Sequence, residues 1–312
     1  MGKETENIFK QLNEFMKDQA SDGLSESERS DLIRDFISDY NEKDHELMTP
    51  DKARTAEDYM ELAEQADTSE EAVRYAKKAL KLNPDDLDAE LFIVDCTSEN
   101  PLEALKGFAK VKDHGDLIME RDGLFDEENI GHFWGLLETR PYMRARYHYM
   151  RMLLDCGMAR KAAEECEDML RLCEGDSLGV RYALMHIYAL LEDEADALSL
   201  YHKYHGETDT QMLLPLSMIY FKKNDPKNAK KYLDKLRVCN KDTRRFIKAV
   251  CENKGDTILD AMGEFGYIPN TMQEYAEEFM SYFFVFDMAD VFFFWANEAL
   301  TPKKKTTSKK KK

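Results

Sequence analysis

The segment SEEAVRYAKKALKLNPDD, residues Ser69 to Asp86, decides the fold class. Within it, Ala72, Ala79 and Leu80 recur at helical spacing and form one apolar stripe. Pro84 cannot continue a helix and ends this one. Because small residues on such a stripe let a second helix approach closely, the segment predicts one helix of an antiparallel helix pair.

The same pattern returns along the chain at intervals of about 34 residues. A single helix pair cannot bury its own apolar face, so consecutive pairs must stack on one another. The sequence therefore predicts an all-α protein built as a solenoid of helix hairpins. The further copies of the pattern are PLEALKGFAKV from Pro101, the segment 143–176, the segment containing Leu184 and Ala197, and the segment containing Leu216 and Ala229.

The stretch NPDD, residues 83–86, directly follows the helix end KALKL and resembles the tetratricopeptide repeat. This resemblance covers about residues 56–240. It implies a right-handed solenoid of tetratricopeptide-like hairpins with capping helices at both ends. The expected domains are N-terminal capping helices in 1–50, the helical repeat domain in 51–300 and a disordered lysine-rich tail in 301–312.

The first fifty residues are expected to form two helices, at about 8–19 and 28–41. SDGLSESE between them supplies a turn and an N-cap serine. Their acidic faces suit contact with solvent, which favours a role in capping the stack. A partly ordered leader is the alternative.

The charge of the chain is uneven around a net value of −18. Residues 1–100 hold 27 acidic against 12 basic side chains, whereas residues 303–312 hold seven lysines. An acidic body repels nucleic acid and anionic membranes, so affinity for either would have to come from the tail. A nucleic-acid- or ribosome-associated factor that acts through this tail is therefore the alternative function. A role of the tail in solubility, or in folding back onto the acidic half, stays open.

Nothing in the sequence indicates catalysis, a cofactor or a bound metal. There is no phosphate-binding glycine loop and no GxSxG or HExxH motif. The six cysteines show no CxxC pairing and are expected to be reduced core thiols of a cytoplasmic protein. His202 and His205 have a metal-compatible spacing, but no further ligand is placed beside them. The chain is accordingly not expected to be an enzyme.

The stretch FWGLLETRPYMRAR, residues 133–146, reads as a joint at which a helix begins. Pro141 suits the first turn of that helix, and Trp134 and Tyr142 are expected to pack at the joint. Together with GVRYAL from Gly179 and the following EADAL, the stretch resembles bacterial tetratricopeptide proteins related to the suppressor of tumorigenicity 7 family. Some members of that family carry a cysteine-rich zinc module. This chain lacks it, so no metal role is carried over.

Seven side chains are expected to line the concave side of the stack as a partner-binding groove. Arginine binds carboxylates in a two-pronged manner, and neighbouring aromatic side chains hold apolar groups. The groove would take a protein or peptide ligand, with acidic segments favoured, and the chain would serve as a non-catalytic interaction scaffold. The alternative is that the arginines form structural ion pairs with Glu138, Asp155 and nearby acids. The predicted groove residues are Arg144, Tyr147, Arg151, Tyr182, His186, Phe221 and Lys222.

The segment from Ser281 to Leu300 is the most apolar part of the chain. Asp287 and Asp290 near its middle argue against a membrane span. A turn between these two residues would instead make two short helices that close the solenoid. The aromatic side chains exceed what a terminal cap needs, and they suggest a surface for a partner or for self-association.

Overall fold

The computed structural model describes residues 3–19, 25–42, 48–264 and 266–301, and these contain α-helices and no β-strand. The chain forms two compact units, Met1–Tyr149 and Met150–Lys312. The predicted all-α fold of paired helices is confirmed, whereas the predicted division into domains stays a prediction. The predicted lysine-rich tail lies outside the described residues from position 302 onward.

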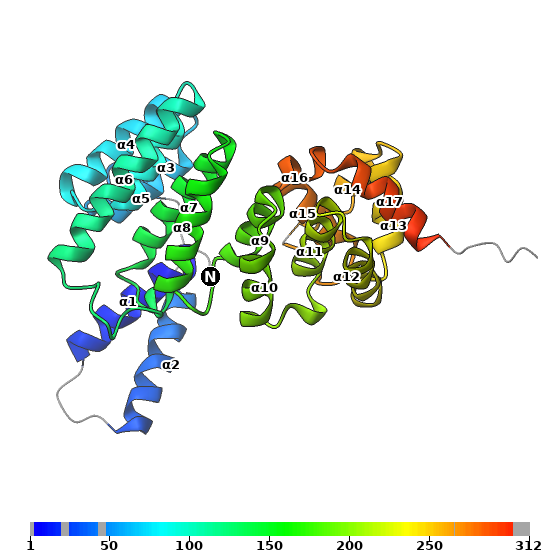
Figure 1. Ribbon diagram of the computed structural model, residues 1–312. Coiled ribbons are helices and arrows are strands. Elements are labelled where there is room, and N and C mark those ends of the chain that lie inside the picture. Colours follow the sequence, from blue (N-terminus) through cyan, green and yellow to red (C-terminus); the bar gives the residue numbers. More distant parts are fainter. Residues whose placement is uncertain (1–2, 20–24, 43–47, 265, 302–312) are drawn as a thin grey trace, which may run out of the picture. The chain divides into compact units, whose positions relative to one another are not determined.

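The first unit contains helices α1 to α6 and most of α7 (Figure 1). Consecutive helices contact one another along the chain from α3 to α6, as expected for stacked hairpins. The helices of this unit are α1 (Lys3–Gln19), α2 (Glu26–Glu42), α3 (Ala56–Gln65), α4 (Ser69–Leu82), α5 (Leu87–Thr97), α6 (Pro101–Arg121) and α7 (Arg140–Asp155), with a 3₁₀ turn, η1 (Phe133–Gly135), before α7.

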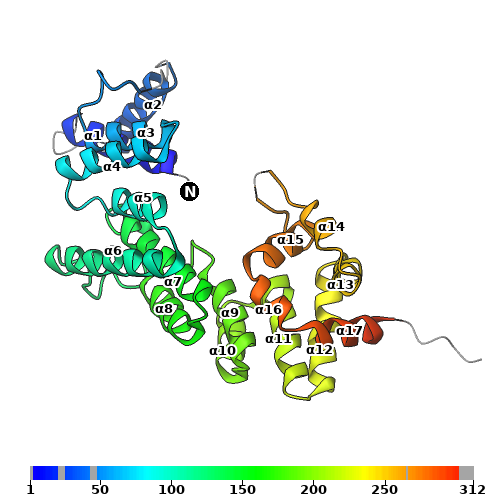
Figure 2. The same cartoon turned by 90° about the horizontal axis from the view of Figure 1, so that it is seen from above.

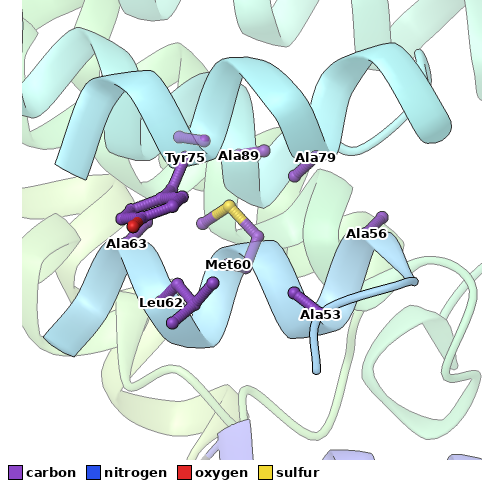
Figure 3. Close-up of a cluster of buried hydrophobic side chains, with 9 residues drawn as sticks. Ala53, Ala56, Met60, Leu62, Ala63, Tyr75, Ala79 and Ala89 are labelled. Atoms are coloured by element: carbon purple, nitrogen blue, oxygen red, sulfur yellow. The ribbon is translucent and has the colours of Figure 1, made fainter. Parts of the chain in front are cut away.

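The hairpin of α3 and α4 shows why the sequence pattern specifies this fold. Thr55 and Asp58 cap the start of α3 with reciprocal side-chain to backbone hydrogen bonds, a capping box. Between the two helices, buried alanines surround the side chains of Met60 and Tyr75 (Figure 3). Ala79 is fully buried there because only a small side chain lets the neighbouring backbone come close.

Gly115 in α6 is where the side chain of Tyr142 from α7 packs. A Cβ atom at Gly115 would lie 2.6 Å from Cδ2 of Tyr142 and 3.2 Å from Cδ1 of Leu87. Tyr142 is buried and donates a hydrogen bond of 2.6 Å to Asp116, so its ring cannot move aside easily. The sequence expectation that Tyr142 packs at this joint is met.

We expect Gly115→Ala to lower the free energy of unfolding of the first unit by about 1–3 kcal/mol, because overpacking outweighs the better helix propensity of alanine. Urea unfolding followed by Trp134 fluorescence in a Trp295→Phe background reports on this unit alone, since the chain has two tryptophans. Asp113→Ala on the exposed face of α6 is the control and should change little. Equal effects of the two substitutions would contradict the packing argument.

The second unit continues the pattern with further helix pairs (Figure 1). Helices that follow one another in the chain pack together in the pairs α9 with α10, α11 with α12 and α13 with α14. The buried faces of α11 and α12 are bridged by Ser217, whose hydroxyl donates to the carbonyl of Ala229. The helices are α8 (Ala159–Leu172), α9 (Val180–Leu191), α10 (Glu194–Lys203), α11 (Thr210–Lys222), α12 (Pro226–Cys239), α13 (Thr243–Cys251), α14 (Gly255–Leu259), α15 (Met272–Ser281), α16 (Phe283–Asp287) and α17 (Asp290–Leu300), with a 3₁₀ turn, η2 (Gly206–Thr208), before α11.

The last three helices return along the second unit and cover the first helices of its pairs. Helix α16 contacts α9, α15 contacts α11 and α13, and α17 contacts α11, α12 and α13 (Figure 2). The turn predicted between Asp287 and Asp290 is present, because α16 ends at the first of these residues and α17 begins at the second. Among the described residues, no helix is both long enough and apolar enough to cross a membrane.

Candidate partner-binding site

Arg144 on α7 holds two carboxylates of the first unit with its guanidinium group. Its Nε and Nη2 atoms donate to the two oxygens of Asp88 on α5, at 2.7 and 2.6 Å. Nη1 and Nη2 donate to Glu6 on α1 at 2.9 and 3.3 Å, and the side chain of Glu6 is only 3% exposed. Burial opposes the charge of the guanidinium, but these hydrogen bonds outweigh it and raise the pKa of Arg144.

Arg144 thus forms two-pronged contacts with carboxylates of the chain itself, those of Glu6 and Asp88. These are ion pairs within the chain, of the kind that the alternative expected with Glu138, Asp155 and nearby acids, and the groove for a partner stays a prediction. Tyr147, three residues farther along α7, is half-buried in the same unit.

Arg140, one turn before Arg144, completes the joint at which α7 begins. Its Nε atom donates to the carbonyl of Trp134 at 2.9 Å, and its guanidinium lies over the indole ring. Its Nη1 atom lies 3.9 Å from the carboxylate of Glu6. The arginines of the stretch 133–146 therefore organise a structural joint and also hold the acidic helix α1.

In the second unit, Arg151 near the end of α7 reaches the C-terminal helices. Its Nη1 atom donates to the carbonyl of Ser281, the last residue of α15, at 3.1 Å. The guanidinium also lies 5.9 Å from the ring centre of Tyr282. A helix C-terminus carries partial negative charge, so a cation is well placed here.

His186 on α9 lies at the centre of this contact and is completely buried. Its Nδ1 atom lies 2.7 Å from the carbonyl oxygen of Tyr182, and its Nε2 atom lies 2.8 Å from Oε1 of Glu278 on α15. The ring of Tyr282 stacks on the imidazole with 4.1 Å between the ring centres, and Phe286 approaches at 6.3 Å.

The hydrogen bonds of His186 fix the position of one proton. A carbonyl oxygen only accepts, so Nδ1 carries a proton and donates to Tyr182. Burial favours the neutral pair, in which Nε2 accepts a hydrogen bond from the protonated carboxyl group of Glu278. Burial supports both assignments, because it lowers the pKa of His186 to about 3 and raises the pKa of Glu278 well above its usual value, with further upward contributions from Glu274 and Asp209.

Tyr182 on α9 is half-buried in a polar cluster beside the start of α11. Its hydroxyl accepts from Arg181 at 2.7 Å and donates to Asp209, the N-cap of α11, at 3.0 Å. Burial raises the pKa of Tyr182, and the carboxylate of Asp209 adds to this effect. The phenol of Tyr182 therefore keeps its proton near neutral pH and can donate this bond.

Phe221 and Lys222 at the end of α11 have separate roles. The ring of Phe221 packs against Phe292 and Trp295 of α17, at 5.6 and 5.2 Å between ring centres. The ammonium of Lys222 donates to the carbonyls of Ala189 and Leu190 at 2.9 and 3.1 Å, which caps the end of α9.

Three of the predicted groove residues, Arg151, His186 and Phe221, are therefore brought together under the helices α15 to α17. Tyr182 and Lys222 flank them on α9 and α11, and Arg144 and Tyr147 belong to the first unit. We call the side of α9, α11 and α13 that these three helices cover the first-helix face.

Sequence reasoning missed the groups that fill this face, Glu278, Tyr282 and Phe286. Their spacing of four residues is a signal in the sequence that groups them, although Tyr282 lies between α15 and α16 and interrupts the helix.

Additional hydrogen bonds fix the start of α15 on the second unit. The side-chain amide of Asn240 donates to the carbonyl of Thr271 at 3.1 Å. The hydroxyls of Thr243 and Tyr275 lie 2.9 Å apart in a fully buried position. The C-terminal helices are thus anchored by polar groups at one end and by aromatic contacts along their length.

The described residues contain no group of three or more His, Cys, Asp or Glu side chains placed to hold a metal ion. Burial raises the pKa of the thiol of Cys239 to about 11 and that of Cys166 well above its usual value. Both thiols are therefore protonated near neutral pH and are poor nucleophiles.

Comparison with known proteins adds little to this description. No family model matches the chain, so the resemblance to relatives of the suppressor of tumorigenicity 7 family is not confirmed. No curated protein matches it either. Among solved structures, the chain is similar to the crystal structure of the MamA protein, with 15% sequence identity, a TM-score of 0.43 and coverage of 61% of this chain and 94% of the other.

Proposed function

We propose that this protein is a non-catalytic interaction scaffold whose first helices bind helical segments of partner proteins. One observation carries this proposal. In each unit, side chains of the first helices hold a helix that presents a carboxyl group, α1 through Glu6 in the first unit and α15 through Glu278 in the second.

The chemistry of these contacts suits segments with acidic and aromatic residues. Arg144 provides a fork for a carboxylate, and His186 accepts a hydrogen bond from a carboxylic acid. Phe221 adds a flat apolar surface at the end of α11. Binding of an amphipathic helix along the apolar and polar groups of a helical scaffold is a common mode of recognition.

Site-specific photo-crosslinking in the host tests this proposal. A benzophenone amino acid at Tyr147 or at Phe221 probes the two units on the side of the first helices, and the same amino acid at Lys161 or Lys231 probes exposed positions of α8 and α12. We expect adducts with one partner from the first pair of positions and not from the second pair. Adducts that do not depend on the position would contradict the proposal.

The same experiment separates the proposal from the alternative of binding through the tail. A chain that ends at residue 301 lacks the seven terminal lysines. Adducts at Tyr147 and Phe221 should persist in this shortened chain. Their loss would instead favour a factor that acts through the tail and binds nucleic acid or ribosomes.

A further inference from the structure

We propose that the first-helix face of the second unit binds a partner segment that carries a glutamate followed by aromatic residues at the fourth and eighth positions and folds as two short helices, and that this segment replaces the chain's own α15 and α16. This inference rests on the proposed function and names the partner of that site by its chemistry.

The spacing comes from the segment that lies on the face. Glu278 lies on α15, Tyr282 is the residue between α15 and α16, and Phe286 lies on α16. All three contact the same residue, His186, by a hydrogen bond, a stacked ring and a tilted ring. The buried imidazole therefore contacts a carboxyl group and two rings at defined positions of a segment of two short helices.

The outer side of the same segment is apolar too, although nothing in the described residues covers it. Met280 and Phe283 are 60% and 53% exposed, and Val291 and Phe294 on α17 are 71% and 57% exposed. A terminal helix whose only task is to close a fold keeps polar residues on its outer side. Exposed apolar patches of this kind mark surfaces that contact other molecules.

The fit of the segment on His186 is also incomplete. Oε2 of Glu278 is buried without a hydrogen-bond partner, and such an atom weakens the contact that buries it. The connection from α14 to α15, residues 260–271, is long enough to span about 40 Å when extended. The segment can therefore leave its position while α13 and α14 stay folded.

Hydrogen exchange of the full-length wild-type chain tests the inference with a synthetic peptide as the probe. The peptide has the sequence of residues 271–290 with Met280→Gln and Phe283→Gln, which alter exposed positions only, improve solubility and give a distinguishable mass. We expect it to accelerate exchange of amides in α15 and α16 at least about tenfold, because these two helices are released. Exchange in α9 and α11 should stay slow.

A matched peptide that also carries Glu278→Ala and Tyr282→Ala should have no effect. The inference is overturned if this control peptide acts like the first one, or if α15 and α16 exchange only together with α11 and α12.

A second measurement removes the competition by the chain's own segment. Fluorescence anisotropy of the labelled first peptide should show at least about tenfold tighter binding to the Tyr282→Ala chain than to wild type, because the substitution weakens the stacking on His186. No binding to this variant would overturn the inference.

The inference is also overturned if light scattering shows a dimer in which two wild-type chains swap α15 to α17. The segment on the first-helix face then comes from a second copy of the same protein. If the peptide does not change hydrogen exchange but crosslinking at Tyr147 still depends on position, this inference is wrong and the scaffold proposal stands. If neither the peptide effect nor the position-dependent crosslinks are seen, the scaffold proposal is wrong as well.

Discussion

Glu278→Gln is expected to make the second unit more stable than wild type above pH 4.5, by an amount that grows with pH. The carboxyl group of Glu278 has a raised pKa in the folded chain and its ordinary value of 4.5 when unfolded. Wild type therefore loses stability as pH rises from 4.5 through the raised value, at about 1.4 kcal/mol per pH unit. A glutamine amide donates to Nε2 of His186 without titrating and avoids this loss.

Other groups near Glu278 titrate as well, and their effects have to be separated. Burial raises the pKa of Glu274 and of Asp209, which destabilises the folded state as pH rises. Burial lowers the pKa of His186 to about 3 from 6.5, so stability is lost as pH falls below 6.5. The buried phenol of Tyr275 has a raised pKa and stays neutral. Because these groups are present in both proteins, the difference between variant and wild type isolates residue 278.

The measurement is urea unfolding at pH 5, 6, 7 and 8, followed by Trp295 fluorescence in a Trp134→Phe background that reports on the second unit. Glu278→Ala is the matched control. It should destabilise at every pH, because it leaves Nε2 of His186 without a donor and opens a cavity. If the free energies of unfolding of wild type and of the glutamine variant change in parallel with pH, Glu278 is ionised in the folded chain.

The helices of this protein could be predicted from the sequence because the information that specifies them is local. In SEEAVRYAKKALKLNPDD, the alanines that face the neighbouring helix and the proline that ends the segment lie within 18 residues. The predicted turn between Asp287 and Asp290 also depends on neighbouring residues only. Spacing and turn chemistry were therefore sufficient for the fold class.

The partners of the predicted site residues could not be predicted in the same way. Arg144 contacts Glu6, which lies 138 positions away, and His186 contacts Glu278, which lies 92 positions away. A helical stripe shows that a side chain faces along its helix, but it does not show which distant segment covers that face. The groove prediction assigned the acidic ligand of Arg144 to another protein, and the alternative assigned it to Glu138, Asp155 and nearby acids of the chain. In the structure the acids are Glu6 and Asp88 of the chain itself.

Arg144→Ala should lower the free energy of unfolding of the first unit by about 3–5 kcal/mol, because it removes the cation that forms hydrogen bonds with the buried carboxylate of Glu6 and leaves only the more distant Arg140. The measurement is urea unfolding followed by Trp134 fluorescence in the Trp295→Phe background. Arg144→Lys should recover only part of the loss, since an ammonium cannot form the two-pronged contacts with Asp88 and Glu6.

Arg121 is a matched control because it also binds two carboxylates, those of Asp85 and Asp122, but its side chain is 55% exposed. Arg121→Ala should have little measurable effect, since water replaces the lost partner. Adding Glu6→Gln to Arg144→Ala should recover stability, because the substitution removes the unpaired charge. If Arg144→Ala costs no more than Arg121→Ala, α1 is not held by this ion pair, and Arg144 is then free to bind the carboxylate of a partner.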